Sequence, residues 1–460
     1  MKSISIKKIV IILVCYCCFS SCEDYLEIND PYGQLPNDEV FEDEITATAA
    51  VTTMYAKLRD EVLITGGQTG LGFLMGLYAD ELDYYALGEH AELFYLHQVI
   101  ASDATVANLW NSAYNLVYMS NAVLEGLENS QTLTLEVKKQ LKGEALFVRA
   151  LSHFYVVNLF SDCPFITTTD FQNNTEVVRT PETEVYQYII ADLVEAKSLL
   201  GNSYITSERT RPNKWVVSSL LSRVYLYTEQ WEKAENESSQ IINSTALYDI
   251  QVPLEEIFLK QSPSAIWQLK PKNEGDNTLE GLLYFLSSPP PQISALNPEL
   301  INDMETTDLR KQHWVNEVSD GTSSWYLPYK YKQNSNTGTS MEYSIVFRLA
   351  EQYLIRAEAR ARLGNLSGAQ ADINVIRLRA GLDNTTATNQ EELIDAIITE
   401  RRFELFTEHG HRWFDLKRTG LADQILSPIK PGWASTNILL PIPENELLMN
   451  PNLNPQNPGY

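Results

Sequence analysis

The sequence predicts a mainly all-α fold, a scaffold of tetratricopeptide-like helix pairs with one irregular, loop-rich face. Three observations predict it. Long segments repeat apolar residues at intervals of three and four, which is the period of an amphipathic helix. Two of these segments resemble each other as helix–turn–helix units. Between these two segments lies a stretch rich in Pro, Gly, Ser and Asn, residue types that favour turns and loops.

The first 21 residues have the pattern of a secretory signal peptide. Three lysines occur among the first eight residues, an apolar run covers residues 9–19, and small residues precede Cys22. A membrane span takes about 20 apolar residues, so we favour a signal peptide over an N-terminal anchor helix. A cysteine at this position is where bacterial lipoproteins are cut and acylated. We therefore expect Cys22 to be the lipidation site.

Cysteine usage and net charge limit the possible partners. After removal of the signal peptide, only Cys22 and Cys163 remain, and a lipidated Cys22 leaves no intrachain disulfide. No later segment is long and apolar enough to be transmembrane, so we expect a protein that is anchored to a membrane and does not cross it. The formal net charge of -25 argues against nucleic-acid binding, which needs a basic face. The negative charge of the chain is more compatible with a neutral partner or a small ligand.

Helical signals dominate the first half of the chain. We expect four amphipathic helices, at residues 47–62, 103–130, 136–166 and 182–201. In the third segment, Ser161, Asp162 and Pro164 end the helix.

The two similar segments cover residues 215–242 and 346–382. Each has a bulky residue and an alanine just after the turn, Trp231 with Ala234 and Leu366 with Ala369. An ordinary helical hairpin is the alternative. The region between these segments has long loops and short strands such as AIWQLK. The final segment, rich in Pro and Asn, is expected to be extended and without helix.

The stretch ERRFELFTEHGHRWFDLKR, residues 400–418, concentrates charge as an active site does. Glu400, Glu404 and Glu408 are spaced four apart, which places them on one stripe of a helix that we expect Gly410 to end. Glycosidase carboxylates instead flank a bond, about 5 to 9.5 Å apart and usually on separate elements. We therefore interpret the stretch as helix packing through ion pairs with its arginines.

Metal and cofactor chemistry is not indicated. His409 and His411 are two residues apart, so on a helix they point to different faces. The sequence has no zincin motif, CxxC pair, phosphate-binding loop, nucleophile elbow or dinucleotide fingerprint. We expect no catalytic residue, no metal site and no cofactor, and hence a protein that is not an enzyme.

Five segments, in order along the chain, resemble the SusD/RagB family, the cell-surface nutrient-binding lipoproteins of Bacteroidetes. The resemblance runs from residue 21 to the last residue. The family more often has Glu-Gly-x-Arg where this chain has EHGHR at residues 408–412. The matching segments are SCEDYL (21–26), EALFVRALSHFYVVNLFSDCPFI (144–166), RLAEQYLIRAEARARLGNLSGAQADINVIRLRAGL (348–382), the charged stretch (400–418) and LPIPENELLMNPNLNPQNPGY (440–460).

The resemblance implies an α-helical scaffold of tetratricopeptide-like pairs with a loop-rich ligand-binding face, and no catalysis or cofactor. It implies a lipid anchor in the outer membrane, with the protein facing the cell exterior. It implies capture of oligosaccharide or polysaccharide. It also implies a partner, a TonB-dependent SusC-like barrel transporter, over which the protein lies as a lid and to which it delivers glycan.

The resemblance also suggests how the chain is organised after the signal peptide of residues 1–21. Residues 22–225 would form a SusD-like N-terminal region with tetratricopeptide-like helices. Residues 226–460 would form the RagB/SusD C-terminal region, loop-rich at 252–340, helical at 341–420 and extended at 437–460. We expect both regions to belong to one compact unit.

The family motifs name no ligand residues, so we infer the ligand site from sugar chemistry. A sugar has apolar C–H faces and a rim of hydroxyls, which aromatic rings and nearby polar side chains bind. Two segments provide both, YADELDYYALGEH (78–90) and SSWYLPYKYKQN (323–334). The expected ligand-binding residues are Asp80, Asp83, Tyr84, Tyr85, Trp325, Tyr326 and Tyr329, with Tyr331 close by.

These residues also have structural interpretations. The second segment could be a strand that packs its rings on the helices, and Asp80 could cap a helix. Trp110, at helical spacing from Tyr114, and Trp267, in a strand-like run, are expected in the core.

Three other functions stay open at this point. A peptide-capturing RagB-like lipoprotein would bind an extended peptide through backbone partners along a groove. A surface glycosidase would need two carboxylates facing each other across a cleft. A purely structural repeat scaffold is the third alternative, and the long aromatic loops count mildly against it.

Overall fold

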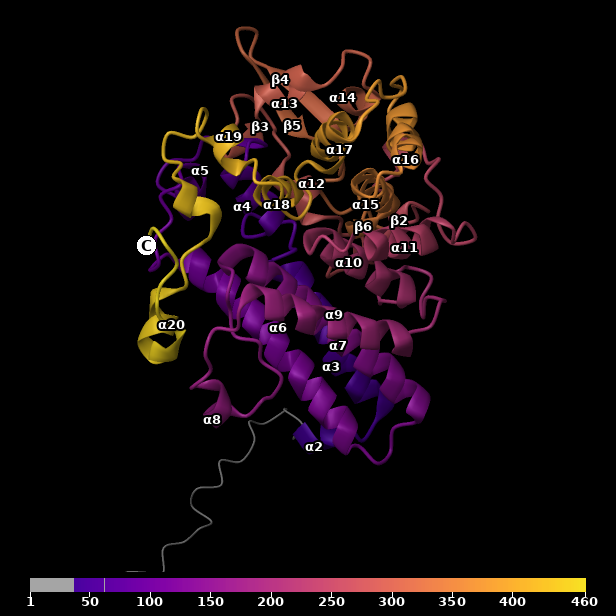
Figure 1. Ribbon diagram of the computed structural model, residues 1–460, viewed down its shortest axis with the longest axis vertical. Coiled ribbons are helices and arrows are strands. Elements are labelled where there is room, and N and C mark those ends of the chain that lie inside the picture. Colours follow the sequence, from indigo (N-terminus) through magenta and orange to yellow (C-terminus); the bar gives the residue numbers. More distant parts are fainter. Residues whose placement is uncertain (1–36, 62) are drawn as a thin grey trace, which may run out of the picture.

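The protein has a lower half of long helices and an upper half of shorter helices, strands and loops (Figure 1). The computed structural model describes residues 37–61 and 63–460. The expected signal peptide and Cys22 lie outside the described residues. Within the described ranges, no helix combines the length and the hydropathy that a membrane span needs. The mainly α-helical class predicted from the sequence is confirmed.

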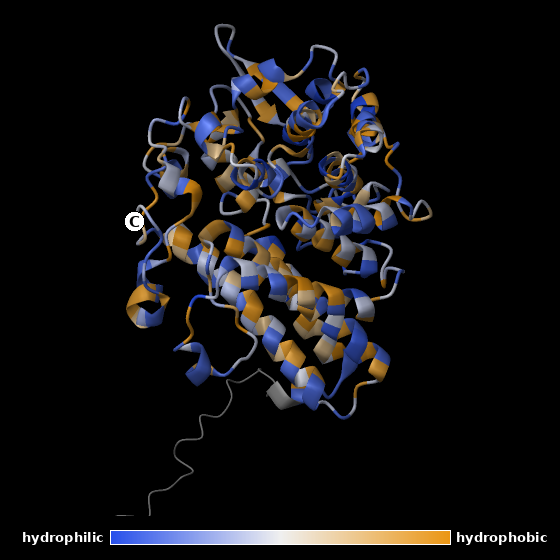
Figure 2. Cartoon of the chain, in the orientation of Figure 1, coloured by the Kyte–Doolittle hydropathy of each residue, from blue (hydrophilic) through white to orange (hydrophobic). Residues whose placement is uncertain are grey.

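Long helices build the lower half, and the four helices predicted there are present. The elements of the first half are α2 (Asn37–Val40), α3 (Glu44–Asp60), α4 (Leu71–Tyr78), α5 (His90–Tyr95), α6 (Ala104–Asn129), α7 (Leu135–Phe160), α8 (Phe171–Asn174) and α9 (Glu182–Leu199). Asp103 and Thr134 accept backbone N–H groups at the starts of α6 and α7. α7 contacts α6 and α9 and is buried continuously from Gly143 to its end. Figure 2 shows hydrophobic and hydrophilic residues side by side along these helices, as amphipathic packing requires.

The two similar segments form two helix pairs, as predicted. The pairs are α10 (Lys214–Tyr227) with α11 (Trp231–Ile242), and α15 (Leu349–Arg362) with α16 (Leu366–Arg379). Ala234 and Ala369 are fully buried after the turns, where a small side chain lets the helices approach. α11 packs against α15, which joins the pairs, and α17 (Gln390–Leu405) packs against α15 and α16.

Two small antiparallel sheets occur in the upper half. One pairs β2 with β6, and the other has the order β1-β3-β5-β4. The strands are β1 (Leu82–Tyr84), β2 (Ala265–Leu269), β3 (Ser294–Leu296), β4 (Val315–Ser319), β5 (Ser324–Pro328) and β6 (Ser344–Arg348). The short helices among them are η2 (Leu254–Glu256), α12 (Leu279–Leu283), α13 (Pro298–Asp303) and α14 (Leu309–Trp314).

One buried core connects the two halves. Trp267 of β2 lies against Phe147 of α7 and Phe347 of β6, with ring centroids 5.1 and 5.9 Å apart. Trp267 and Trp110 are both buried, so the prediction that they belong to the core is confirmed. Because α7, β2 and β6 share these contacts, the helical half and the loop-rich half hold each other in place.

The C-terminal segment is not the extended, helix-free tail predicted from its composition. After α18 (His411–Arg418) and α19 (Ala422–Leu426), the segment predicted to be extended, residues 437–460, contains α20 (Glu444–Met449) and η4 (Pro451–Leu453), and η3 (Ser435–Ile438) reaches into its start. Pro443 precedes α20, and Glu444 and Glu446 lie in its first turn, where negative charge stabilises a helix. Asn457 donates hydrogen bonds to the carbonyl oxygens of Phe160 at 3.0 Å and Leu440 at 2.8 Å, which fastens the tail to α7.

Candidate functional site

The charged stretch of residues 400–418 forms two helices joined by a tight turn. α17 ends at Leu405, and α18 begins directly after Gly410. The prediction that one helix contains Glu408 and ends at Gly410 is therefore wrong. The turn packs against Gly72, where an added Cβ would lie 2.7 Å from a carbonyl oxygen of the turn, so its shape depends on tertiary packing. The turn residues with positive φ are Thr407 (57°), His409 (46°) and Gly410 (79°).

Glu404 is the centre of a buried ion cluster. Its carboxylate lies 3.2 Å from Arg310 and also pairs with Arg348 and Arg379. These arginines belong to α14, β6 and α16, so one carboxylate of α17 connects four elements. Burial by itself raises the pKa of Glu404, but the three arginines outweigh burial and hold the pKa well below its usual value. The interpretation of the stretch as ion-paired packing is confirmed at this residue.

Asp80, one of the expected ligand residues, belongs to a second buried cluster. Arg412 donates to both of its carboxylate oxygens, at 2.6 and 2.8 Å, and Arg402 lies 3.1 Å away. Asp80 is buried with both oxygens engaged, so we withdraw it from the candidate site. The next residue, Glu81, accepts the Thr407 backbone N–H at 3.1 Å. Burial raises the pKa of Glu81 to about 8, although this hydrogen bond opposes the shift.

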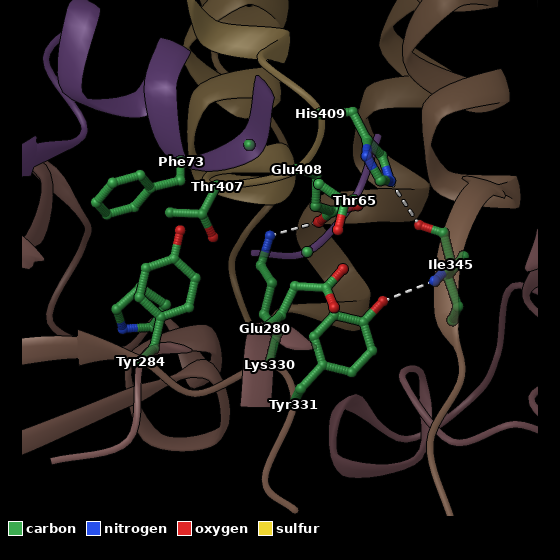
Figure 3. A pocket seen from close by; sticks show the side chains of 13 residues that line it. Thr65, Phe73, Glu280, Tyr284, Lys330, Tyr331, Ile345, Thr407, Glu408 and His409 are labelled. Atoms are coloured by element: carbon green, nitrogen blue, oxygen red, sulfur yellow. Dashed lines mark hydrogen bonds and ion pairs between the residues drawn. The ribbon is translucent and has the colours of Figure 1, made fainter. Parts of the chain in front are cut away.

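A cavity beside the charged turn is surrounded by titratable side chains (Figure 3). Lys330 points at Glu408 and lies 2.5 Å from its carboxylate. Burial lowers the pKa of Lys330 to about 8 and raises the pKa of Glu280 to about 7. Perturbed pKa values often mark active sites. The cavity has a volume of about 20 Å³, however, which suffices for a single water molecule and not for a substrate.

Other reactive side chains near this turn also have structural roles. The Tyr331 hydroxyl accepts the Ile345 N–H at 2.8 Å, and His409 Nε2 donates to the Ile345 carbonyl at 2.9 Å. Burial lowers the pKa of His409 and of His411. In residues 37–61 and 63–460, no three His, Cys, Asp or Glu side chains gather in a way that could hold a metal ion. Cys163 is buried, and burial raises the pKa of its thiol to about 12, which suppresses the nucleophilic thiolate.

The four-stranded sheet brings together the two aromatic segments that the sequence analysis singles out. β1 comes from the first segment and β5 from the second, and β3 pairs with both. Leu296 of β3 lies opposite Leu82 on one side and Tyr326 on the other. Tyr85 extends the pairing, since its N–H donates to the Ile293 carbonyl at 2.9 Å. The two segments are therefore parts of one surface.

Strand pleating divides their aromatic residues between the two faces of the sheet. Successive residues point to opposite faces, and residues in register share a face. Asp83, Tyr85 and Trp325 are on one face by this register. Burial raises the pKa of Tyr85, and the nearby Trp325 side chain partly opposes the shift. Tyr84 and Tyr326 are on the other face, half-buried against the core.

Asp83 is held in place by two polar neighbours. Asn297 Nδ2 and the Tyr95 hydroxyl donate to its Oδ1 at 3.1 and 3.4 Å. In the described part of the chain, no hydrogen bond engages the Oδ2 atom, which leaves an acceptor for a ligand. Burial raises the pKa of Tyr95 to about 12, and Asp83 adds to the shift, so Tyr95 stays a donor at neutral pH. We call Asp83, Tyr85, Tyr95 and Trp325 the sheet-face cluster.

Further side chains border the sheet-face cluster. Phe285 is exposed and lines a hollow of about 150 Å³ together with Ile293 and Leu327. Tyr329 is exposed just beyond β5, and its ring centroid lies 5.5 Å from the Lys332 Nζ atom rather than against Tyr85. Tyr95 and Phe285 were not among the ligand residues predicted from the sequence. The only sequence signals for them were weak: Tyr95 is close along the chain to the first aromatic segment, and a proline-rich loop follows Phe285.

The sheet-face cluster has the chemistry of a sugar site. Rings on one face of the sheet can stack on the C–H faces of a pyranose, and a carboxylate oxygen and a phenol can bond its hydroxyls. Tyr85 is 39% exposed, so one ring is open to solvent without movement of the scaffold.

Two family models match the chain. Residues 26–226 match the family model described as "Starch-binding associating with outer membrane", and residues 301–460 match the SusD family model. Among curated proteins, SusD-like protein P2 of Formosa agariphila is 27% identical over the full length of both chains. The starch-binding protein SusD of Bacteroides thetaiotaomicron is 25% identical over 73% of this chain and 74% of its own.

Solved structures have the same fold. A SusD-like protein from Bacteroides fragilis superposes with a TM-score of 0.77 and 20% identity, over 93% of this chain and all of that chain. A laminarin-binding SusD-like protein gives a TM-score of 0.77 with 22% identity, over 91% of this chain and all of that chain. At this level of identity these two likenesses establish the fold alone.

Replacement of Glu404 by glutamine should destabilise the protein by roughly 3–5 kcal/mol, because the buried arginines lose their compensating charge. The free energy of unfolding would be measured by chemical denaturation. The control is Glu391→Gln, at the exposed start of the same helix, with an expected loss below about 1 kcal/mol. Equal losses in the two variants would show that the cluster does not stabilise the fold.

Replacement of Glu81 by glutamine should stabilise the protein at high pH, in contrast to Glu404→Gln, which should destabilise it. The pKa of Glu81 is about 8 in the folded protein, against an ordinary value of 4.5 for a glutamate side chain, so folding keeps a proton on this carboxyl. Stability is therefore lost as the pH rises from about 4.5 to 8, and glutamine removes this loss. Thermal unfolding should show near-equal stability of the two proteins at low pH and a more stable variant above pH 8. A difference that does not change with pH would contradict the assignment.

Proposed function

We propose that this chain, which belongs to the SusD/RagB family, captures neutral oligosaccharide through its sheet-face cluster. SusD-like proteins are binding proteins rather than enzymes. The observation that carries the proposal is the strand pairing that puts Tyr85, Trp325 and Asp83 on one face of the sheet, where Asn297 holds Asp83. Relatives named as starch-binding and laminarin-binding support a glycan as ligand.

The charge of the chain favours a neutral ligand. The formal net charge is -25, and the sheet-face cluster contributes a carboxylate. An acidic polysaccharide would meet repulsion from both, whereas a neutral sugar needs only stacking and hydrogen bonds. The cavity in Figure 3 is too small to hold a sugar, so it cannot be a site of glycoside hydrolysis.

We further infer delivery of the bound glycan to a TonB-dependent SusC-like transporter in the outer membrane. In this proposal the protein is held at the cell exterior by lipid on Cys22 and covers the transporter as a lid. The family model over residues 26–226, whose description joins starch binding to the outer membrane, supports this location. The division into regions 22–225 and 226–460 stays a proposal; the family models cover residues 26–226 and 301–460.

Replacement of Trp325 or Tyr85 by alanine should weaken glycan binding by roughly tenfold or more, because each variant loses a stacking surface. The soluble form, residues 23–460, would be screened on a glycan array and the best hit titrated by calorimetry. Tyr188→Ala on α9 is the matched control, since this tyrosine is 44% exposed and lies on another element. Unchanged affinity in the Trp325 and Tyr85 variants would exclude the sheet-face cluster as the site. Binding of peptides without binding of any glycan on the array would favour the peptide-capturing alternative.

Replacement of Cys22 by serine should prevent acylation and release the protein from the membrane fraction, because lipid is the proposed anchor. Labelling of cells with radioactive palmitate, followed by fractionation, would measure both effects. Cys163→Ser is the control and should keep label and location, since this thiol is buried. A serine variant at position 22 that stays in the outer membrane would contradict the lipid-anchor proposal.

A further inference from the structure

A second hollow is lined by residues of α6, α8 and α20. Figure 1 shows these three helices in the lower half of the molecule. The volume of this hollow is about 430 Å³, against about 150 Å³ for the hollow beside the sheet. None of the four residues of the sheet-face cluster lines it. In Figure 1, α8 and α20 lie in the lower half of the molecule, whereas β3, β4 and β5 lie near its top. We call this hollow the α6 groove.

Aromatic side chains form one wall of the α6 groove. Trp110, Tyr114 and Tyr118 are spaced four apart on α6, and all three line the groove. The ring centroids of Trp110 and Tyr114 are 4.8 Å apart. Tyr118 is 51% exposed, and Phe171 of α8, which lines the same groove, is 76% exposed. Core packing does not account for two rings so far in solvent, and such rings are suited to stacking.

Free amides accompany the rings. Asn111 and Asn115 are exposed, adjacent to the aromatic residues on α6 and one turn apart. Across residues 37–61 and 63–460, neither side-chain amide makes an intramolecular hydrogen bond. Each amide therefore offers donors and an acceptor to a ligand. Both residues also line an adjoining open hollow of about 480 Å³, so the binding surface continues across the helix.

The charge of the α6 groove limits the ligand class. Among the described residues that line the groove, Glu446 of α20 is the one ionisable carboxylate, and none is a lysine or an arginine. Burial raises the pKa of Glu446. In the adjoining hollow, Lys57 and Glu61 neutralise each other at 2.7 Å. A phosphorylated or acidic ligand would find no cation here, so charge complementarity favours a neutral ligand.

An apolar ligand fits the α6 groove less well than a polyhydroxylated one. Met449 of α20 adds an aliphatic side chain to the lining, and α20 carries both hydrophilic and hydrophobic residues in Figure 2. The amides of Asn111 and Asn115 would lose their hydration against an apolar partner without gaining hydrogen bonds. A sugar satisfies both kinds of surface, because its C–H faces meet the rings and its hydroxyls meet the amides.

We propose that the α6 groove is a second binding site, for neutral oligosaccharide, separate from the sheet-face cluster. The ligand class is shared with the proposed function, but the residues and the arguments are independent of the sheet. Two sites on one chain would hold a polysaccharide at two points and raise its apparent affinity through a high effective concentration.

The test uses hydroxyl-radical footprinting of the soluble form, residues 23–460, with maltooligosaccharides and laminari-oligosaccharides as neutral probes and an oligogalacturonate as the acidic probe. A bound neutral probe should protect Tyr118 and Phe171 separately from Tyr85 and Trp325. The double variant Tyr118→Ala/Phe171→Ala should lose protection in the groove and reduce calorimetric stoichiometry from about two ligands per chain to about one. These side chains are exposed, so the variant should fold, which circular dichroism would check. Tyr188→Ala is the control and should bind as the wild type does.

The residue-resolved readout separates this inference from the proposed function. Protection of Tyr85 and Trp325 alone, with stoichiometry unchanged in the double variant, would overturn the second site and leave the proposed function standing. Protection of Tyr118 and Phe171 alone would support the second site and overturn the sheet-face proposal. A double variant that binds glycan normally but no longer co-purifies with a co-expressed outer-membrane barrel would show that the groove docks a protein, and the inference would be wrong. Equal protection by the acidic probe would overturn the argument from charge.

Discussion

Glu404 keeps a negative charge in a place closed to water, and this is possible only because arginines from three other elements surround it. Moving α14, β6 or α16 away would leave a buried charge without a partner, which costs several kcal/mol. Glu408 extends the constraint through Arg348 and Lys330. The ion cluster therefore specifies how the second helix pair, the small sheets and α17 fit together.

The sheet-face cluster depends on this scaffold through the two residues that precede β1. Asp80 is bound by Arg412, and Glu81 accepts a hydrogen bond from the turn at Thr407. The start of β1 is thereby fixed against the turn between α17 and α18. From that point the antiparallel register determines that Tyr85 and Trp325 lie on the same face of the sheet. The charged stretch thus positions the candidate site without belonging to it, and its perturbed pKa values result from burial and ion pairing rather than from catalysis.

Much of the fold could be predicted because its signals are local. The period of apolar residues identified α6, α7 and α9, and the spacing of Trp231 with Ala234 and Leu366 with Ala369 identified the helix pairs. The end of α17 was placed wrongly because the turn at residues 406–410 is stabilised by packing against Gly72 and by distant ion partners. α20 was missed because the proline and asparagine content of the tail hid a short helix with an acidic first turn.

Sequence alone determined the helical class, the paired repeats, the anionic character of the chain and the residue types from which a sugar site could be made. Each of these depends on composition or on neighbours within a few residues. Only the tertiary structure decided which of those residues meet. It puts Asp83, Tyr85 and Trp325 on one face of the sheet, because β3 pairs with both of their strands. It adds Tyr95 and Phe285 to the candidate site. It also removes Asp80 from the site, because Asp80 is engaged in an ion pair. The physical reason is that strand register, burial of charge and the walls of a groove are set by contacts between segments far apart along the chain, and local sequence patterns do not encode those distances.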